Sequence, residues 1–400
     1  MSGALDGYRV VDITSILSGP YGTQLLGDAG ADVIKVEAPP KGDSTRYMGR
    51  GRSANMSGPF LNSNRNKRSI ALDLKQDSGK EALRALIKSA DVLVHNMRPQ
   101  AIARLGFAYE DVRAIKPDIV YCGCYGYSQK GRYKDKPAYD DLIQACSGLA
   151  GLFGDVQGEP KYAPTVLVDK LTGLTISQAV TTALLHRERT GQGQFVEVPM
   201  FENMVAFLMV EHLYEHSFEP PLGPMGYKRL TTPMRRPNKS KDGYVAVLPY
   251  SDGQWHAFFR IAGRGELAED PRFADHGTRT EHVHAIYGLV SELIAEKTTG
   301  EWLALCEEAQ IPAMPVLSLD EVFADPHLAD VGLFEQHDHP SEGKIVMTAP
   351  PVGYSESPGS IRRQAPRFGE QGAEILTELG YDAGAIADLK ASGALTGEPE

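Results

Sequence analysis

Two apolar segments near the N-terminus decide the fold, Tyr8-Arg-Val-Val-Asp-Ile-Thr14 and Ala31-Asp-Val-Ile-Lys-Val-Glu37. Both are rich in β-branched residues and therefore predict strands, whereas residues 22–30 predict a helix that ends at a glycine. Parallel strands need a crossover connection, usually a helix, so this order indicates a parallel strand–helix–strand unit.

The same alternation continues along the chain. Residues 69–74, 90–95 and 118–123 predict three further strands, and residues 75–90 predict a helix between the first two. Tight hairpin signals are missing, so we expect an α/β fold with a Rossmann-like, doubly wound sheet. In such sheets ligands usually bind beyond the carboxyl ends of the strands. Residues 42–67 predict a long irregular loop, and loops of that length are usually functional or disordered.

The second half of the chain suggests a further, smaller domain. Prolines concentrate in residues 219–237, which is typical of an extended linker, and helical patterns follow. A second break lies near residues 338–351, before another helical segment. We expect the following organisation: a large Rossmann-like domain over residues 1–218, a linker over 219–240, a small α+β domain over 241–335, and a linker with a C-terminal return to the large domain over 336–400.

Composition excludes several classes of protein. The 400 residues are 42% apolar and can bury a sizeable core, which argues against a disordered chain. Lysine and arginine number 41 against 52 acidic residues, a net charge of −11, which argues against a nucleic-acid partner. We expect no membrane association, because no apolar run approaches about 18–20 residues. The absence of a secretory signal and the four reduced cysteines predict a cytoplasmic protein.

One carboxylate is a candidate catalytic group. Asp169 lies in Tyr162-Ala-Pro-Thr-Val-Leu-Val-Asp-Lys-Leu-Thr-Gly173, at the start of a predicted apolar helix over residues 171–187. It could cap that helix. It could also act as a nucleophile, because an aspartate with an ordinary pKa of about 3.9 is ionised at neutral pH without a base. No metal site is expected: His282 and His284 are two residues apart on a predicted helix and do not share a face.

Several blocks of sequence carry a family resemblance. They are Val10-Val-Asp-Ile-Thr14, Leu26-Gly-Asp-Ala-Gly-Ala-Asp-Val-Ile-Lys-Val-Glu37, Asn66-Lys-Arg-Ser-Ile-Ala-Leu-Asp-Leu-Lys75, Asp91-Val-Leu-Val-His-Asn-Met-Arg-Pro99, Ala138-Tyr-Asp-Asp141, the Asp169 block and Thr190-Gly-Gln-Gly-Gln194. In this order and spacing the chain resembles the class III CoA-transferases (the CaiB/BaiF family, which includes formyl-CoA transferases). The resemblance extends through the C-terminal segment.

The resemblance implies a mechanism and an assembly. Asp169 would become an aspartyl-CoA thioester, so that CoA passes from an acyl-CoA donor to a carboxylic acid without a prosthetic group or metal. Two chains would interlock as a homodimer, with the linkers as crossings. Coenzyme A or acyl-CoA, as substrate, would contact a set of residues from the N-terminal part of the chain: Ile16, Ser18, Leu72, Lys75, Asn96, Arg104 and Lys136.

Three departures from the family pattern bear on specificity. Position 38 is Ala where formyl-CoA transferases tend to have Arg, and position 17 is Leu where oxalate-specific enzymes carry Gln. The second departure argues against oxalate. Many relatives have a glycine run where this chain has Tyr250-Ser-Asp-Gly-Gln254, which puts a mobile glycine lid in doubt. Amides of this segment, or of the helix start at Asp169, are candidates for stabilising oxyanions.

Two alternative functions remain open at this stage. Racemases of 2-methylacyl-CoA esters share the fold and use a histidine where this chain has Tyr139, and tyrosine is a poor base at neutral pH. A non-catalytic acyl-CoA-binding protein could dispense with Asp169. For a transferase, Lys and Arg residues within 228–241 could select a dicarboxylate or form a solvated linker. Succinyl-CoA as donor and a short dicarboxylic acid as acceptor are the leading candidates.

Overall fold

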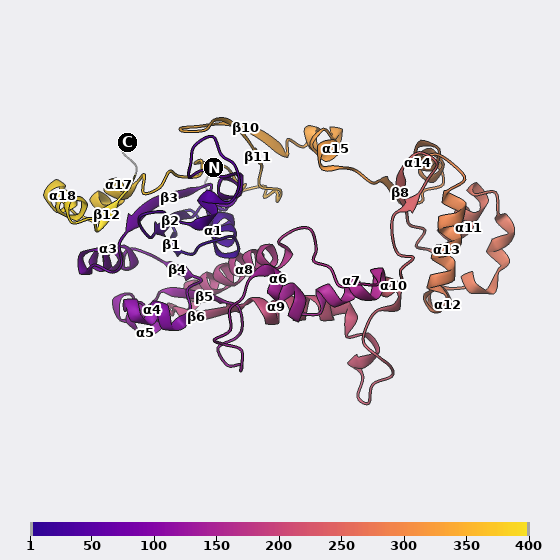
Figure 1. Ribbon diagram of the computed structural model, residues 1–400, viewed down its shortest axis with the longest axis horizontal. Coiled ribbons are helices and arrows are strands. Elements are labelled where there is room, and N and C mark those ends of the chain that lie inside the picture. Colours follow the sequence, from indigo (N-terminus) through magenta and orange to yellow (C-terminus); the bar gives the residue numbers. More distant parts are fainter. Residues whose placement is uncertain (1–2, 398–400) are drawn as a thin grey trace. The chain divides into compact units, whose positions relative to one another are not determined.

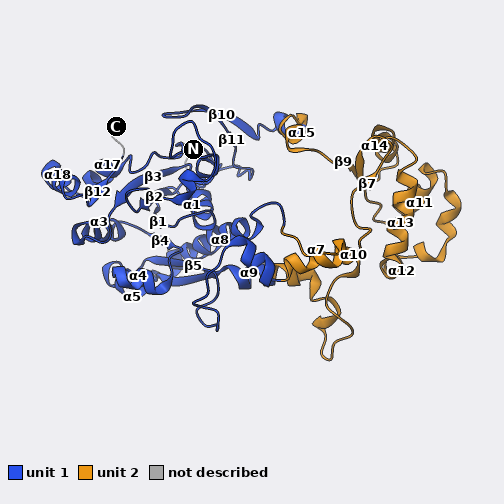
Figure 2. Ribbon diagram, viewed as in Figure 1, with its two compact units in different colours: residues 1–147, 163–205, 327–400 blue, residues 148–162, 206–326 orange. Residues whose placement is uncertain are grey.

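A computed structural model of the protein describes residues 3–397. The chain forms two compact units, shown in Figure 2. Unit 1 comprises residues 1–147, 163–205 and 327–400, and unit 2 comprises residues 148–162 and 206–326.

Unit 1 is built on one seven-stranded sheet (Figure 1). The strand order is β12-β3-β2-β1-β4-β5-β6, and every pairing is parallel except that of β12 with β3. The six parallel strands follow the Rossmann order, with its switch point between β1 and β4. The predicted α/β fold with a mostly parallel central sheet is therefore confirmed. The strands are β1 (Arg9–Ile13), β2 (Asp32–Glu37), β3 (Lys67–Leu72), β4 (Val92–His95), β5 (Val120–Tyr125), β6 (Gln194–Pro199) and β12 (Leu395–Thr396).

Helices cover both faces of this sheet. On one face, α1 and α8 pack on each other and against the strands. On the other face, α3 and α17 pack against the strands, and β10 and β11 form a separate hairpin. The elements are α1 (Ser18–Asp28), η1 (Ser44–Tyr47), α2 (Gly58–Leu61), α3 (Asp77–Lys88), α4 (Pro99–Leu105), α5 (Tyr109–Ile115), α6 (Asp140–Cys146), α8 (Leu167–Thr190), α9 (Met200–His212, which crosses into unit 2), β10 (Phe334–His339), β11 (Gly343–Thr348), α17 (Gly372–Glu378) and α18 (Ala383–Ala391).

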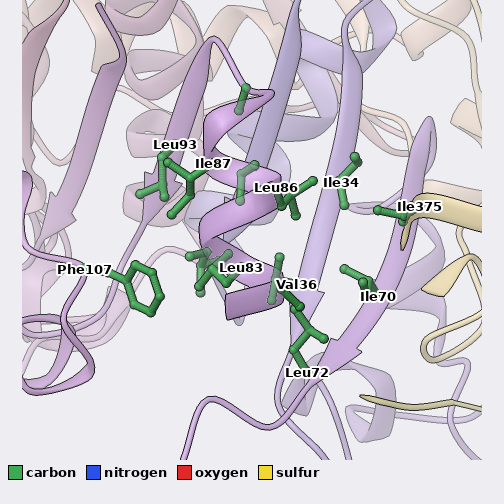
Figure 3. Close-up of a cluster of buried hydrophobic side chains, with 14 of the residues drawn as sticks. Ile34, Val36, Ile70, Leu72, Leu83, Leu86, Ile87, Leu93, Phe107 and Ile375 are labelled. Carbon is green, nitrogen blue, oxygen red and sulfur yellow. The ribbon is translucent and has the colours of Figure 1, made fainter. Parts of the chain in front are cut away.

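The main core lies on the sheet face that α3 covers (Figure 3). Leu83, Leu86 and Ile87 recur at helical spacing, so α3 presents one apolar stripe to the strands. The strands supply every second side chain to this face, among them Ile34 and Val36 of β2. Ile375 of α17 packs into the same cluster, which ties the end of the chain to its beginning.

The opposite strand face carries buried charges instead. Asp12 of β1, Lys35 of β2 and Lys67 of β3 are fully buried there, and Lys67 Nζ lies 2.9 Å from Asp12 Oδ2. These polar residues explain why β3 begins two residues before the predicted strand: Lys67 and Arg68 belong to a buried strand because aspartates pair with both of them. A buried charge is tolerated when it is paired and hydrogen-bonded.

Unit 2 combines helices with a small antiparallel sheet of order β7-β8-β9. Its core is aromatic: Trp255, Phe258 and Phe259 of α11 pack with Phe273 and Trp302. The elements are α7 (Leu149–Gln157), η2 (Tyr214–Ser217), α10 (Lys228–Thr231), β7 (Asn238–Lys239), β8 (Tyr244–Val247), α11 (Asp252–Ile261), η3 (Gly265–Glu269), η4 (Pro271–Phe273), α12 (His276–Glu281), α13 (Val283–Ile294), α14 (Thr299–Glu308), β9 (Ala313–Pro315), α15 (Leu319–Phe323) and α16 (Pro326–Asp330), which crosses into unit 1.

Candidate active site

A cavity of about 310 Å³ opens at the switch point of the unit 1 sheet. The segments that follow β1, β4 and β5 contribute Ser15 and Ile16, Asn96 and Met97, and Gly126, respectively. This is the edge where ligands of doubly wound sheets bind. Side chains with catalytic or anion-binding potential join the lining: Ser18, Arg98, Cys124, Lys134, Lys136, Tyr139 and Asp169.

Asp169 is held in the first turn of α8 by a contact with α6. The N-terminal cap of α8 is Val166, so Asp169 is not the cap that the sequence allowed. Its own amide N–H donates to Asp140 Oδ2 at 3.0 Å, which removes that amide from the candidate oxyanion donors. Gln144 donates to the other oxygen of Asp140 and accepts the amide N–H of Ala163 at 2.9 Å. These contacts fix the segment that carries Asp169.

The electrostatics of Asp169 differ from the expectation of an ordinary pKa. Burial, followed by the charges of Asp140 and Asp141, raises the pKa of Asp169 to about 7. Loss of solvent and like charges both disfavour the ionised carboxylate. Strongly shifted carboxylates in cavities are typical of functional sites. Lys134 and Lys136 line the same cavity, so an anionic ligand would meet both cations and a weakly ionised carboxyl group.

The loop after β1 is held in an unusual conformation. Ile16 has a φ of 72°, which is rare for a β-branched residue. Its amide donates to Asp43 Oδ1 at 3.0 Å, and Ser15 exchanges two hydrogen bonds with the side chain of Asn96. Lys35 Nζ donates to the carbonyl of Thr14 and pairs with Asp43 at 2.9 Å. Strained backbone that several neighbours fix in this way is common at ligand-binding sites.

A second cavity of about 770 Å³ adjoins the first in unit 1. Ser15 and Met97 line both cavities. The larger one extends past the ends of β2 and β3, where Ala38, Leu72 and Lys75 contribute to its wall. Its volume is within the range of small-molecule and cofactor sites.

A sequence model of CoA-transferase family III matches residues 5–372. The chain belongs to this family. It is therefore a class III CoA-transferase, and the acyl-CoA thioesters on which such enzymes act are its class of substrate. The family resemblance inferred from the sequence blocks is confirmed.

This CoA-transferase is similar to characterised and solved relatives over nearly its whole length. It is 34% identical to a succinyl-CoA:glutarate CoA-transferase of Mus musculus, covering 98% of this chain and 90% of that protein. It is 33% identical to a formyl-CoA:oxalate CoA-transferase of Afipia carboxidovorans, covering 99% and 98%. The structure resembles that of a CaiB/BaiF family protein from Brucella suis, with a TM-score of 0.80, 32% identity and coverage of 95% and 100%.

The structure of the CoA-transferase gathers most of the predicted site residues. Six of them line the smaller cavity: Ile16, Ser18, Asn96, Lys136, Tyr139 and Asp169. Leu72 and Lys75 line the larger one. Arg104 is exposed on α4 and lines neither cavity, although its neighbour Leu105 lines the larger.

Sequence reasoning missed several residues at this site. Arg98 and Lys134 line the smaller cavity, and Asp140 positions Asp169. Arg98 and Asp140 both lie inside sequence blocks that resemble the family, so this resemblance could have pointed to them. The segment at 250–254, considered as a lid, forms the capping box of α11: Gln254 Oε1 accepts the amides of Tyr250 and Ser251. These two amides are therefore already used.

Among residues 3–397, no group of histidine, cysteine and acidic side chains could hold a metal ion. Within the same residues, no helix is long and apolar enough to cross a membrane.

Proposed function

We propose that this CoA-transferase moves CoA from succinyl-CoA to a short dicarboxylic acid through an aspartyl-CoA thioester on Asp169. One observation carries the proposal: Ser15 and Met97 join a cavity large enough for much of a CoA molecule to the cavity that contains Asp169. A relative of Mus musculus named for succinyl-CoA and glutarate supports this choice of donor and acceptor.

The proposed reaction exchanges one activated acyl bond for another. The Asp169 carboxylate attacks the donor thioester carbonyl, which gives a mixed anhydride and releases CoA thiolate. The thiolate attacks the aspartyl carbonyl, forms the aspartyl-CoA thioester and frees the donor acid. The acceptor carboxylate attacks that thioester, and the released thiolate then attacks the acceptor carbonyl. The products are the new acyl-CoA and a regenerated Asp169 carboxylate.

We assign the lining residues roles that suit this chemistry. Lys136, with Ile16, Ser18 and Asn96, would hold the pantetheine and phosphate parts of CoA, and Leu72 and Lys75 would contact the nucleotide in the larger cavity. Tyr139 is 64% exposed at the start of α6, where its hydroxyl could donate to a substrate oxygen. The exposed Arg104 is proposed to reach a phosphate from the rim.

An assay of acyl-CoA donors against carboxylic acids tests the proposed substrates. If the enzyme does not transfer CoA from succinyl-CoA to any short dicarboxylic acid, this choice of donor and acceptor is refuted.

The raised pKa of Asp169 predicts the pH dependence of transfer. Only the carboxylate attacks, so kcat/KM should rise tenfold per pH unit below the pKa of about 7 and level off above it. Replacing Asp141 by Asn removes one of the charges that raise this pKa, so the acid limb should move to lower pH, with transfer roughly two- to threefold faster there. Asp388→Asn, on the exposed surface of α18, is the matched control. A profile that is flat across neutrality would contradict the assignment.

We also propose that two chains interlock as a homodimer, with residues 219–240 and the segment from 336 onward as the linkers between the large and small domains. Large apolar side chains exposed on α9 support an interface, among them Val210, which is 83% exposed. An interlocked pair cannot separate without unfolding. Sedimentation should therefore detect dimers even at high dilution, and native monomers would refute the proposal.

A further inference from the structure

Unit 2 contains a cavity of its own, of about 300 Å³, and none of its lining residues takes part in the covalent steps of the proposed reaction. Its lining comes from α10, the β7 and β8 region, α11 and α13. Apolar side chains form one part of the wall, notably Val247, Trp255 and Val290. Three arginines form another part: Arg229, Arg235 and Arg236.

Arg229 is the most constrained of these arginines. It is half-buried, its Nε donates to the hydroxyl of Tyr287 at 3.0 Å, and its guanidinium carbon lies 5.4 Å from the centre of the Tyr250 ring. These contacts hold the side chain in place, and the Tyr227 side chain is a second hydrogen-bond partner; both hydroxyl partners are neutral. A guanidinium has five N–H donors in a fixed fork, so donors of Arg229 remain for a ligand.

Two neighbouring cations in unit 2 are paired with carboxylates, whereas the cavity arginines are not. Lys228 pairs with Glu281 at 3.0 Å and Arg279 pairs with Asp252 at 2.6 Å. In the part of the chain that the structure describes, no carboxylate forms an ion pair with Arg229, Arg235 or Arg236. This concentration of unpaired positive charge is notable in a protein of net charge −11. It favours an anionic ligand.

The size and the wall of the cavity limit what that ligand can be. A volume of about 300 Å³ is ten times the roughly 30 Å³ that one water molecule occupies in the liquid. That is enough for a short organic acid and less than half of the larger cavity in unit 1. A carboxylate matches the guanidinium fork in a bidentate manner, and a hydrocarbon body would lie against Trp255 and Val247.

We propose that this cavity binds a short-chain carboxylic acid, with its carboxylate on Arg229 and its hydrocarbon chain against Trp255. The site does not depend on Asp169. The bound acid is either the acceptor substrate or an effector acid. The two have the same chemistry, and enzyme kinetics distinguish them.

The two tryptophans of the chain provide a direct readout of binding. Trp255 lines the cavity, whereas Trp302 is fully buried in the core of unit 2 and donates to the carbonyl of Ile294. The full-length protein labelled with fluorotryptophan should give two fluorine NMR signals, assigned with a Trp255→Phe variant. Pentanoate should shift the Trp255 signal in a saturable manner and leave the Trp302 signal in place. Pentanol has a similar chain but no charge, and should bind at least about tenfold more weakly.

Variants make the assignment specific. Arg229→Met should raise the Kd for pentanoate at least about tenfold, and Arg229→Lys should restore only part of the loss. Arg260→Met is the matched control, because Arg260 is exposed on α11 outside the cavity lining, and it should change nothing. Asp169→Ala should also bind pentanoate normally, which separates this test from that of the proposed reaction. An unshifted Trp302 signal in each variant reports an intact core.

Kinetics then identify the source of the acid. If the acceptor occupies the cavity, Arg229→Met raises the KM for the acceptor with little change in kcat. If an effector occupies it, pentanoate changes the rate of the wild-type enzyme without competing with the acceptor, and Arg229→Met abolishes the effect. The proposal is overturned if pentanoate leaves the Trp255 signal unmoved, as it would if a second chain filled the cavity. Equal binding by pentanol or by Arg229→Met would overturn it as well.

Discussion

Replacing Asp169 by Ala should lower the rate of CoA transfer at least about a hundredfold, because the proposed covalent path loses its only nucleophile. Burial is the main reason that the pKa of Asp169 is raised to about 7, which means that the folded protein disfavours the ionised carboxylate. Removing this side chain should therefore not lower the free energy of unfolding. The Asp169 amide would still donate to Asp140, since that bond uses the backbone. CoA binding and the thermal midpoint should therefore be retained.

Two measurements make this test independent of the rate alone. Wild-type enzyme incubated with an acyl-CoA and no acceptor should carry a hydroxylamine-sensitive adduct on the peptide that contains Asp169, and the variant should carry none. Tyr139→Phe is the matched contrast, because it removes one hydroxyl from the same cavity. It should raise the activation free energy of transfer by about 1–3 kcal/mol, the cost of one lost hydrogen bond. An Asp169→Ala enzyme that kept more than about a hundredth of the rate would rule out the mechanism.

The apolar pattern of the sequence was enough to predict the central strands of the sheet. β1, β2 and β4 are rich in β-branched residues, β5 is fully buried, and the apolar spacing of α3 matches its buried stripe. β6, whose side chains alternate only partly toward the core, was not predicted, and β12 has only two residues. The break predicted near residues 338–351 overlaps the β10–β11 hairpin, which spans residues 334–348.

The site was less predictable, because its properties depend on pairs that are distant in sequence. Asp140 meets the amide of a residue 29 positions away, and that proximity, with burial, raises the pKa of Asp169. No local pattern around Asp169 contains this information. Similarly, Lys35 and Asp43 look like ordinary charged residues in the sequence, yet they are buried and hold the loop that contains Ile16.

The buried charges of the sheet lead to the second large effect. Asp12 is fully buried on β1, where it contacts Lys67, Thr14 and Thr23. Burial raises the pKa of Asp12, but the ammonium groups of Lys67 and Lys35 outweigh burial and hold that pKa well below its usual range. The carboxylate therefore contributes stability that is present above the unfolded pKa of about 4 and is lost only in strong acid.

Replacing Asp12 by Asn should lower the free energy of unfolding by about 3–5 kcal/mol, because the buried Lys67 loses its carboxylate partner and the buried Lys35 loses a nearby negative charge, while the side-chain volume is kept. Asp32→Asn is the matched control on the neighbouring strand: its carboxylate pairs with Arg9 and Arg68 but is 36% exposed, so the loss should be about 1 kcal/mol or less. Denaturant midpoints at neutral pH measure both.

A double variant keeps this prediction testable even if Asp12→Asn does not fold. Adding Lys67→Met removes the buried ammonium group that Asp12→Asn leaves without a carboxylate partner, so Asp12→Asn with Lys67→Met should be more stable than Asp12→Asn alone. Lys67 would otherwise remain buried with only the carbonyl of Pro20 and the side chain of Asn64 as acceptors. Equal losses for Asp12→Asn and Asp32→Asn, with no recovery in the double variant, would mean that the buried pair adds no more to stability than the partly exposed pairs of Asp32.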